Sequence, residues 1–417
     1  MLDIGFIRDH ADELKIACKN KQMDEKVIDE VIVADIRRRE LQLKMDALRA
    51  QANAQADAIK TVVGGGGKPT PEQIAQGKAI KEQLKELQPA FDEAESLFKK
   101  AMYYVPNMPA EDVPIGANEA GNQVVRREGT LPTYDFTPKQ HFELMENLGW
   151  LDTERAVRIG GFRSYFLKGD AVLWEQALMR LALDILVKEG FTPMTAPVLV
   201  NDETMWGTGY FPWGSEDHYQ TQDGQVLAGT SEVSLTAYRA GEMLNEADLP
   251  YKMVGISPCF RREVGSYGKD LKGVIRVHQF TKVEQVVYTI ADEAETRIWH
   301  EKMVGFSEKL LNTLGLPYQV LLMCTGDMGA GQRKKYDIET WFPAQEKYRE
   351  THSASYFNDF QARRLNIRYR TKDGTIKHVY TLNNTMAASP RLLAALIENY
   401  QQADGSIKVP EALQKWL

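Results

Sequence analysis

The chain has 417 residues, which is too long for one ordinary hydrophobic core and predicts two or three domains. Its hydrophobic content of 43% and charged content of 26% are typical of a globular protein and exclude a disordered one. The net charge of -7 argues against non-specific coating of nucleic acid, which depends on neutralising phosphates, but it allows a local basic patch.

Three cysteines, Cys18, Cys259 and Cys324, lie far apart and form no CxxC pair or Cys-His spacing. We therefore expect neither a disulfide framework nor a zinc site. No run of eighteen apolar residues occurs, and the N-terminal stretch MLDIGFIRDHADELK contains acids where a signal peptide needs an apolar core. These observations predict a cytoplasmic protein with no membrane segment.

The first predicted element is a pair of long helices. From Met23 to Val63 apolar residues follow the 4-3-4-3 spacing of a heptad seam, interrupted by Arg38 and Gln55. After the break GGGGKPTP at 64–71, a second seam runs over 80–101. Two matching seams joined by a glycine-rich turn predict an antiparallel helical hairpin.

This predicted arm covers about residues 24–104, with its tip at about 64–71, within an N-terminal domain of residues 1–105. At 1.5 Å per residue, about forty residues give an arm roughly 60 Å long, which should project from its domain. The spacing alone leaves an oligomerisation coiled coil open as an alternative. The mixed charges of the distal part favour binding to another molecule only weakly.

Residues 106–160 begin with a proline- and glycine-rich stretch and indicate a linker. In the remaining segment, 161–417, a helical pattern at 170–190 precedes strand-like runs, among them 251–263 and 275–289. Because strands follow one another without regular helical crossovers, we expect an antiparallel sheet and an α+β fold. Neither a GxxxxGK[ST] nor a GxGxxG loop is present, which excludes the two commonest nucleotide-binding loops.

The segment FRREVGSYGKDLKGVIRVHQF, residues 260–280, combines basic residues, glycines and aromatics. In strand geometry Arg261 and Glu263 share one face, and so do Arg276 and Phe280. Arginine can bind phosphate oxygens in a bidentate manner, and phenylalanine offers a stacking surface for a purine. The segment thus indicates a nucleotide site, although a surface hairpin with ordinary salt bridges is the alternative.

Extended to PCFRREVGSYGKDLKGVIRVHQFTKVE, this segment resembles motif 2 (about 255–284) of the class II aminoacyl-tRNA synthetases, in the form of the seryl-tRNA synthetases. Residues 165–200 resemble motif 1, and 385–402 resemble motif 3. GTSEVSL at 229–235 is similar to the family's serine-binding TxE loop, and 325–350 to the segment before its metal site. The N-terminal hairpin resembles the family's tRNA-binding arm, so the resemblance covers nearly the whole chain.

The resemblance implies a serine-tRNA ligase with a class II catalytic core over 161–417. Serine would attack ATP to give seryl-adenylate and pyrophosphate, and the seryl group would pass to the 3'-terminal ribose of tRNA(Ser), with tRNA(Sec) left open as a second substrate. It further implies magnesium as cofactor without zinc, a homodimer formed through motif 1, and binding of tRNA through the arm. A paralogue that loads another carrier is the alternative, although such proteins lack the long arm.

The resemblance also implies roles for individual residues. Arg261, Arg276 and Arg391 are expected to be catalytic, by stabilising charge on the phosphates. The residues expected to bind ATP are Arg261, Arg262, Glu263, Arg276, Val277, Phe280, Glu350, Thr351, His352, Ser353 and Arg391. The residues expected to bind serine are Thr230, Ser231, Glu232, Arg261, Glu284 and Thr385. Glu350 and Ser353 are expected to bind magnesium through hard oxygen ligands.

Within the serine site, Thr230 and Glu232 are expected to receive the ammonium group, and Glu284 and Thr385 the hydroxyl. Alanine or glycine would leave the hydroxyl's partners unpaired, a loss that reaches about 10⁴ to 10⁵ in discrimination. Threonine must instead be excluded by lack of room. No separate editing domain is therefore expected.

Several positions depart from the family pattern, including Ala354, which replaces a cysteine with little consequence. Ser231 replaces an alanine, Tyr356 replaces an asparagine, and Asn384 and Met386 replace glycines. These changes leave open the shape of the nearby pocket wall. We also expect residues 264–273, which lie in the middle of motif 2, to move over the adenylate and meet the tRNA acceptor end.

Overall fold

The computed structural model describes residues 1–264, 270 and 272–417. The predicted motion of residues 264–273 therefore falls mostly outside the described residues. The chain divides into two compact units. The helical unit contains residues 2–19 and 23–106, and the sheet unit contains residues 1, 20–22 and 107–417.

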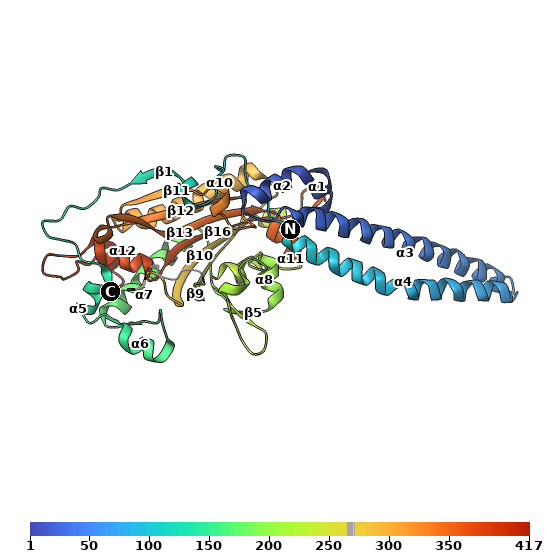
Figure 1. The fold of residues 1–417 in the computed structure, drawn as a ribbon, viewed down its shortest axis with the longest axis horizontal. Helices are drawn as coiled ribbons and strands as arrows, with labels where there is room; N and C mark the ends of the chain where they lie inside the picture. Colours follow the sequence, from blue (N-terminus) through green and yellow to red (C-terminus); the bar gives the residue numbers. More distant parts are fainter. Residues whose placement is uncertain (265–269, 271) are drawn as a thin grey trace. The chain divides into compact units, whose positions relative to one another are not determined.

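The helical unit confirms the predicted antiparallel hairpin, whose two long helices run side by side in Figure 1. Its helices are α1 (Ile4–Asp9), α2 (Ala11–Asn20), α3 (Lys26–Gly64) and α4 (Pro71–Tyr104). Val31, Leu41 and Met45 of α3 and Ile80 and Ala94 of α4 are buried, as the heptad seam predicts.

The two residues that interrupt the seam make polar links instead. The Arg38 guanidinium lies 4.5 Å from the centre of the Phe98 ring and 3.0 Å from the buried carboxylate of Asp35. The Gln55 side-chain amide donates a hydrogen bond to the backbone carbonyl of Gln73, at 2.9 Å. The contacts with Phe98 and Gln73 both join α3 to α4, and Asp35 holds Arg38 in place for the first of them. The hairpin therefore accommodates polar residues within its seam.

A capping box marks the start of α4, directly after the turn that follows α3. Thr70 accepts a hydrogen bond from the Gln73 amide, and the Gln73 side chain accepts one from the Thr70 amide. Pro71 occupies the first position of the helix, where its missing N–H is not needed. The sequence TPEQ therefore fixes where the returning helix begins.

The sheet unit contains an eight-stranded sheet with the order β1-β11-β12-β13-β16-β10-β9-β4. Every neighbouring pair is antiparallel except β4 and β9. This arrangement confirms the predicted α+β fold. The strands of this sheet are β1 (Gln123–Glu128), β4 (Thr192–Thr195), β9 (Tyr251–Phe260), β10 (Gln279–Thr289), β11 (Tyr318–Leu322), β12 (Lys334–Phe342), β13 (Lys347–Asn358) and β16 (Tyr380–Ala388).

Smaller sheets surround this large one. They comprise β2 (Leu151–Asp152) with β3 (Phe166–Leu167), β5 (Leu199–Val200) with β7 (Val226–Leu227) and β6 (Tyr219–Gln220), and β8 (Met243–Asn245) with β14 (Arg368–Arg370) and β15 (Ile376–His378). The helices are α5 (His141–Asn147), α6 (Thr153–Gly160), α7 (Asp170–Lys188), α8 (Asp202–Thr208), α9 (Glu232–Thr236), α10 (Glu293–Thr313), α11 (Phe360–Leu365), α12 (Arg391–Asn399) and α13 (Glu411–Gln414). Among the described residues, no helix combines the length and the apolarity needed to cross a membrane.

The main core lies between the large sheet and helices α7 and α10. Leu178 and Leu186 of α7, Met303 and Leu310 of α10, and Val283 of β10 are all fully buried there. The apolar residues of both helices recur at helical spacing, and α7 agrees with the helical pattern predicted at 170–190. This packing leaves the opposite face of β10, β13 and β16 free to form a site.

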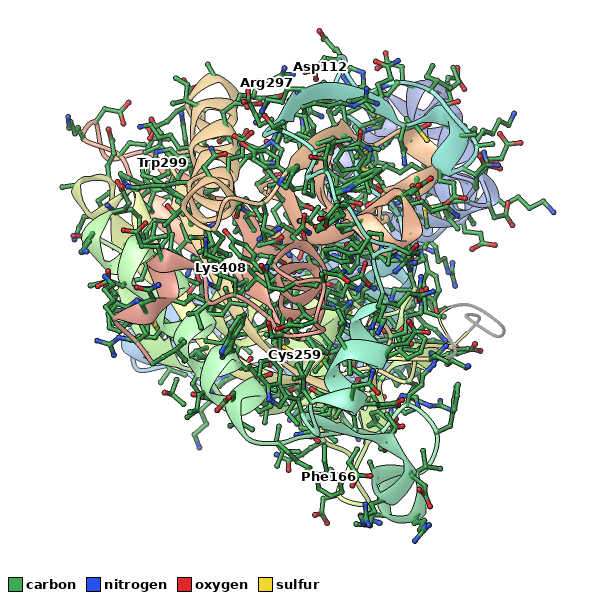
Figure 2. All side chains as sticks on the ribbon, turned by 90° about the vertical axis from the view of Figure 1, so that its left-hand side faces the viewer. Asp112, Phe166, Cys259, Arg297, Trp299 and Lys408 are labelled. Carbon is green, nitrogen blue, oxygen red and sulfur yellow. The ribbon has the colours of Figure 1, made fainter. Side chains whose placement is uncertain are left out.

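The segment 106–160, which its composition indicates as a linker, supplies parts of the sheet unit. It contains β1, which pairs with β11 at the edge of the large sheet, and the helices α5 and α6. Asp112 lies 2.6 Å from the Lys334 ammonium and 3.3 Å from the Arg297 guanidinium, next to which it is labelled in Figure 2. Pairing with distant residues therefore gives this proline-rich segment a fixed course that composition alone does not indicate.

Candidate active site

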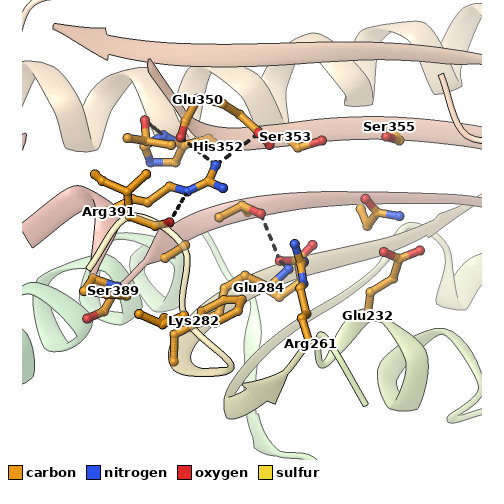
Figure 3. A pocket seen from close by; sticks show the side chains of 18 of the residues that line it. Glu232, Arg261, Lys282, Glu284, Glu350, His352, Ser353, Ser355, Ser389 and Arg391 are labelled. Carbon is orange, nitrogen blue, oxygen red and sulfur yellow. Dashed lines mark hydrogen bonds and ion pairs between the residues drawn. The ribbon is translucent and has the colours of Figure 1, made fainter. Parts of the chain in front are cut away.

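A pocket of about 240 Å³ opens on the face of the large sheet opposite α10 (Figure 3). Strands β10, β12, β13 and β16 supply most of its wall. The remaining lining residues come from α9, from the start of α12 and from loops next to α8, β9, β10, β12 and α12. The lining residues that the sequence predicted are Glu232, Arg261, Glu263, Val277, Phe280, Glu284, Glu350, Thr351, His352, Ser353, Thr385 and Arg391. One pocket therefore brings together most residues of both predicted substrate sites.

A shift in strand register builds one end of this pocket. Between β10 and β16 the pairing slips after Val283, so that Glu284 lies opposite Thr385 and Met386 has no partner in the pairing. Thr385 Oγ1 donates a hydrogen bond to Glu284 Oε2, at 3.2 Å. The bulge thus pairs the two residues that were expected to bind the substrate hydroxyl.

The bulky residues that depart from the family pattern face away from the pocket. The Asn384 amide donates to the Met303 carbonyl of α10 at 2.7 Å, and Met386 is buried in the main core. The Tyr356 ring packs edge-on against His300, also in α10. Successive strand residues point to opposite faces, so Ser355 and Thr385 line the pocket while these neighbours do not.

Close packing of α9 against β9 positions Glu232, the first residue of α9. A Cβ atom on Gly255 of β9 would lie 2.8 Å from Ser231 Oγ, so glycine allows the loop before α9 to approach the sheet. Thr230 Oγ1 accepts a hydrogen bond from the Glu232 backbone amide at 3.1 Å. Thr230 and Ser231, which were also expected to bind serine, are buried and are not among the residues that line the pocket.

Two neutral donors hold the Glu232 carboxylate. The Tyr210 hydroxyl donates to Oε2 at 2.7 Å, and the Gln361 amide donates to Oε1 at 3.2 Å. The same Gln361 nitrogen donates to the Thr208 carbonyl, which fixes the orientation of the amide. Burial raises the pKa of Glu232 to about 7, and the nearby carboxylate of Glu284 adds to this rise.

The two strands predicted at 251–263 and 275–289 are shorter in the structure, so that residues 261–263 and 275–278 lie outside them. Strand β9 ends at Phe260, and Glu263 has a left-handed backbone with φ of 54°. Arg261 and Glu263 nevertheless both line the pocket, because the turn and not a strand directs them. The Arg261 guanidinium lies 5.3 Å from the centre of the Phe280 ring, with both groups on the pocket wall.

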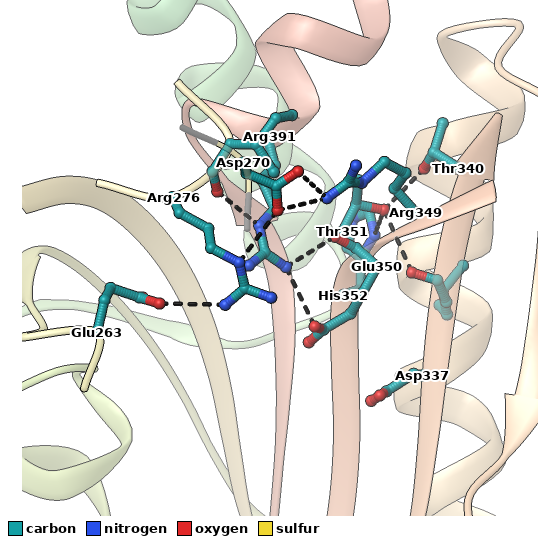
Figure 4. A network of polar contacts seen from close by, with 12 residues as sticks. Glu263, Asp270, Arg276, Asp337, Thr340, Arg349, Glu350, Thr351, His352 and Arg391 are labelled. Carbon is teal, nitrogen blue, oxygen red and sulfur yellow. Dashed lines mark hydrogen bonds and ion pairs between the residues drawn. The ribbon is translucent and has the colours of Figure 1, made fainter. Parts of the chain in front are cut away.

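Two of the predicted arginines do not line the pocket. The Arg262 guanidinium donates to the Glu216 carbonyl at 3.0 Å. Arg276 lies 3.2 Å from Glu263 Oε2 and 3.1 Å from Asp270 Oδ2, as Figure 4 shows. Its guanidinium is therefore held beside the pocket by two carboxylates.

Arg391, at the first position of α12, crosses the mouth of the pocket (Figure 3). Its guanidinium donates to the carboxylate of Glu350 at 3.1 Å and to the Ile275 carbonyl at 3.0 Å. Partial removal from water raises the pKa of Glu350, but the positive charges of Arg391 and Lys335 outweigh this effect and lower it. The Glu350 carboxylate is therefore ionised at neutral pH.

Hard oxygen donors gather beside this ion pair. Glu350 and Ser353 both line the pocket, and Asp337 lies opposite Ser353 in the pairing of β12 with β13. Asp337 Oδ2 lies 3.0 Å from the Lys335 ammonium, whereas its buried Oδ1 has no hydrogen-bond partner among the described residues. Glu350 and Ser353 thus offer oxygen donors of the kind that magnesium prefers. The described residues contain no group of three or more His, Cys, Asp or Glu side chains that could hold a metal ion by themselves.

Among the described residues that line it, the pocket has no activated nucleophile or base of the histidine type. His352 Nε2 donates to the Met386 carbonyl at 3.1 Å, and Nδ1 lies 2.8 Å from Thr351 Oγ1. Burial lowers the pKa of His352 to about 4, so the ring is neutral and both nitrogens are engaged. The described residues of the pocket therefore suit binding and charge stabilisation better than covalent catalysis.

Sequence patterns did not identify several lining residues. The missed residues with polar side chains are Tyr210, Lys282, Gln332, Lys335, Ser355, Asn383 and Ser389. Strand alternation from Glu284 could have found Lys282, and alternation from Ser353 could have found Ser355. Tyr210 and Gln332 carry no such signal, because loops bring them to the pocket from outside these strands.

Two protein-family models match the chain. The seryl-tRNA synthetase N-terminal domain matches residues 1–109, and the tRNA synthetase class II core domain (G, H, P, S and T) matches residues 217–400. A serine-tRNA ligase from Deinococcus radiodurans is 46% identical, with 100% of this chain and 97% of the relative covered. One from Treponema denticola is 39% identical, with 99% and 98% covered.

Solved structures agree with these sequence relatives. The seryl-tRNA synthetase from Pyrococcus horikoshii, complexed with ATP, gives a TM-score of 0.91 at 37% identity, with 100% of this chain and 98% of that chain covered. The cytoplasmic serine-tRNA ligase from Naegleria fowleri, in complex with AMP, gives 0.87 at 30% identity, with 100% and 97% covered. Both the helical unit and the sheet unit thus have full-length counterparts, and the chain belongs to the seryl-tRNA synthetase family.

Proposed function

We propose that this serine-tRNA ligase binds serine and ATP at the two ends of the described pocket and carries out both half-reactions there. The observation that carries this proposal is the joint presence of two kinds of group in one pocket. Glu232, Glu284 and Thr385 form an end suited to an ammonium group and a hydroxyl. Arg261 and Arg391 form an end suited to phosphates.

At the serine end, Glu232 would receive the ammonium group, because its two neutral donors leave its negative charge uncompensated. Glu284 and Thr385 would contact the hydroxyl, since they already share a hydrogen bond at 3.2 Å. Both side chains are almost completely buried, so a ligand without a hydroxyl would leave them unpaired. Thr230 and Ser231 would act indirectly, by holding the loop that carries Glu232.

At the ATP end, Arg261 would contact the α-phosphate and the serine carboxylate, and Phe280 would stack on the adenine. Glu263 and Val277 would contact the adenine end of the nucleotide. Arg391 would contact the γ-phosphate in exchange for its present bond to Glu350.

Arg276 and Arg262 would have less direct roles in ATP binding. The Arg276 side chain is 27% exposed, and phosphate oxygens could replace its contacts with Glu263 and Asp270. Arg262 would anchor the start of motif 2 through its bond to the Glu216 carbonyl.

Magnesium would be held by Glu350 and Ser353, and Thr351 and His352 between them would shape the wall. When bound, the ion would neutralise charge on the triphosphate. Lys335, whose ammonium lies 3.0 Å from Asp337, keeps positive charge at this end of the pocket.

The reaction needs no nucleophile from the protein. The serine carboxylate attacks the α-phosphorus, and the bond to pyrophosphate breaks. The ribose hydroxyl of the tRNA then attacks the carbonyl of the adenylate and loses its proton, the bond between the carbonyl carbon and the phosphate oxygen breaks, and AMP leaves. Arg261, Arg276 and Arg391 would stabilise the charge that develops on the phosphate oxygens. Holding both substrates in one pocket supplies the remaining advantage, because the reacting atoms no longer have to meet by diffusion.

The helical unit would bind tRNA(Ser) along the hairpin, by shape more than by base sequence. We further propose a cytoplasmic homodimer joined through motif 1. In support, three large apolar residues of that motif are exposed, namely Phe166 at 44%, Leu173 at 53% and Leu199 at 45%. Phe166 is labelled in Figure 2. Burial of such residues is a common cause of subunit association.

The first prediction tests the proposed substrate. The full chain with magnesium should exchange pyrophosphate into ATP with L-serine, and should then charge tRNA(Ser). The kcat/KM for alanine should be about 10⁴-fold lower, because alanine leaves Glu284 and Thr385 unpaired. Exchange with alanine or threonine equal to that with serine would contradict the assignment. Charging of tRNA(Sec), measured in parallel, decides whether it is a second substrate.

The second prediction concerns pH. The Glu232 carboxylate must be ionised to bind an ammonium group, and its pKa is raised to about 7. The KM for serine should therefore be constant above about pH 7 and rise below it, approaching roughly tenfold per pH unit. Glu232→Gln removes the titrating group, so its KM should be high and should lack this rise. A wild-type KM that stays constant between about pH 6 and 8 would refute the role of Glu232.

The third prediction separates the two units. Deletion of residues 44–85, replaced by a short turn, should abolish most tRNA charging while it leaves serine-dependent pyrophosphate exchange close to the wild-type rate. The physical reason is that the described pocket draws all its lining residues from the sheet unit. Equal losses in both half-reactions would mean that the hairpin supports the fold of the catalytic site.

The fourth prediction concerns Arg391. Arg391→Ala should lower the exchange rate at least about a hundredfold, the usual loss when one group that stabilises a developing charge is removed. Its melting temperature should stay near that of wild type. Arg155→Ala is the control, because Arg155 forms an exposed ion pair with Asp152 and should change neither quantity. An Arg391→Ala enzyme with wild-type activity would remove Arg391 from the phosphate site.

A further inference from the structure

The serine end of the pocket contains a third charged residue, Lys282, which the proposed roles do not use. Lys282 and Glu284 are two residues apart on β10, so their side chains point to the same face of the sheet. The Lys282 ammonium lies 2.5 Å from Glu284 Oε2. The Lys282 side chain is 6% exposed and that of Glu284 is 2% exposed, so this is a buried ion pair that lines a substrate pocket.

The position of a lysine here is unexpected on electrostatic grounds. An end of the pocket that receives an ammonium group from the substrate would bind it more tightly without a second ammonium nearby. A buried ion pair also contributes little net stability, because desolvation of both charges offsets their attraction. Stability alone therefore does not account for Lys282.

The two carboxylates of this end have different partners. Glu232 accepts hydrogen bonds from Tyr210 and Gln361. Both donors are neutral, so neither balances the negative charge of Glu232. The charge of Glu284 is balanced by Lys282. Burial and then Glu284 raise the pKa of Glu232, and Lys282 opposes that rise, which indicates that the three charges act on one another.

We infer that Lys282 is a specificity-determining positioning residue, which dedicates Glu284 to the serine hydroxyl and leaves Glu232 to bind the ammonium group. This inference rests on the proposed serine site. It deepens that proposal by explaining how two similar carboxylates in one pocket take different parts of the substrate.

The hydrogen-bond pattern supports this division. A carboxylate paired with an ammonium group can only accept hydrogen bonds. Thr385 gives its single hydroxyl proton to Glu284 Oε2, so its own oxygen is left as an acceptor as well. No hydrogen bond reaches Glu284 Oε1 from the described part of the chain. The subsite therefore offers acceptors to the ligand and selects a ligand that brings an O–H donor.

Without Lys282, Glu284 would carry an unbalanced charge close to Glu232. It would then compete for the substrate ammonium or take up a proton, and in both cases it would stop being a dedicated hydroxyl acceptor. Lys282→Met removes the charge and keeps a similar side-chain length. We expect it to lower the ratio of kcat/KM for serine to that for alanine by about tenfold or more.

The test is ATP-pyrophosphate exchange by the full chain with serine and with alanine, for the wild type and three variants. Lys282→Arg keeps the charge and should restore most of the wild-type ratio. Lys334→Met is the matched control, because it also removes a lysine of low exposure from an ion pair, with Asp112 at 2.6 Å, and Lys334 does not line the pocket. It should change the melting temperature without changing the ratio. Lys282→Gln takes the place of the methionine variant if that variant does not fold.

Each outcome decides between the alternatives. A fall in the ratio for Lys282→Met, with rescue by arginine and an unchanged KM for ATP, supports the inference. A wild-type ratio in Lys282→Met, or equal damage by arginine and methionine, overturns it and leaves Lys282 as a structural residue. If the wild type itself shows no preference for serine, the proposed function fails instead, whatever the variants do.

Discussion

The site depends on the slip in register between β10 and β16. Side chains along a strand alternate between faces, so a displacement by one residue exchanges the two faces. The bulge after Val283 places Thr385 opposite Glu284 on the pocket face. It also directs Asn384 and Met386 toward α10, where the amide and the thioether have partners in the core. One extra residue in β16 thus decides which side chains face the pocket and which face the core.

The arginines that are proposed to bind phosphates are already paired with acceptors in the protein without a nucleotide. A buried charge is costly unless it is paired, and every arginine of the predicted phosphate site has an acceptor within the chain. Arg391 contacts Glu350, Arg276 contacts Glu263 and Asp270, and Arg261 donates to the Gly229 carbonyl at 3.3 Å. Arg349 joins this network through Asp270, as Figure 4 shows. In the proposed function, phosphate oxygens would replace these acceptors. The arginine side chains would then already be ordered before the nucleotide binds.

The helical unit follows simpler physics, and its sequence predicted more of it. A heptad seam specifies which residues two helices bury, and the glycine-rich break followed by a threonine cap specifies where the chain turns. The seam did not explain Arg38 and Gln55, since a hydrophobic pattern treats polar residues only as interruptions. Their roles depend on Phe98 and on the Gln73 carbonyl across the hairpin. For the same reason the proline-rich segment 106–160 was predicted as a linker, although β1 pairs with a strand nearly two hundred residues away in sequence.

The sequence by itself determined the helical hairpin, the α+β class, the helices of the main core and the family, because these follow from local periodicity and from motifs. The motifs also located most of the pocket, including Glu232, Glu350 and Arg391. Only the tertiary structure decided that β9 ends before Arg261, that Thr230 and Ser231 are buried and do not line the pocket, and that Lys282 lies beside Glu284 within the pocket. These facts depend on register, on turns and on contacts between residues far apart in the chain, and a local pattern does not encode the distance between two such residues.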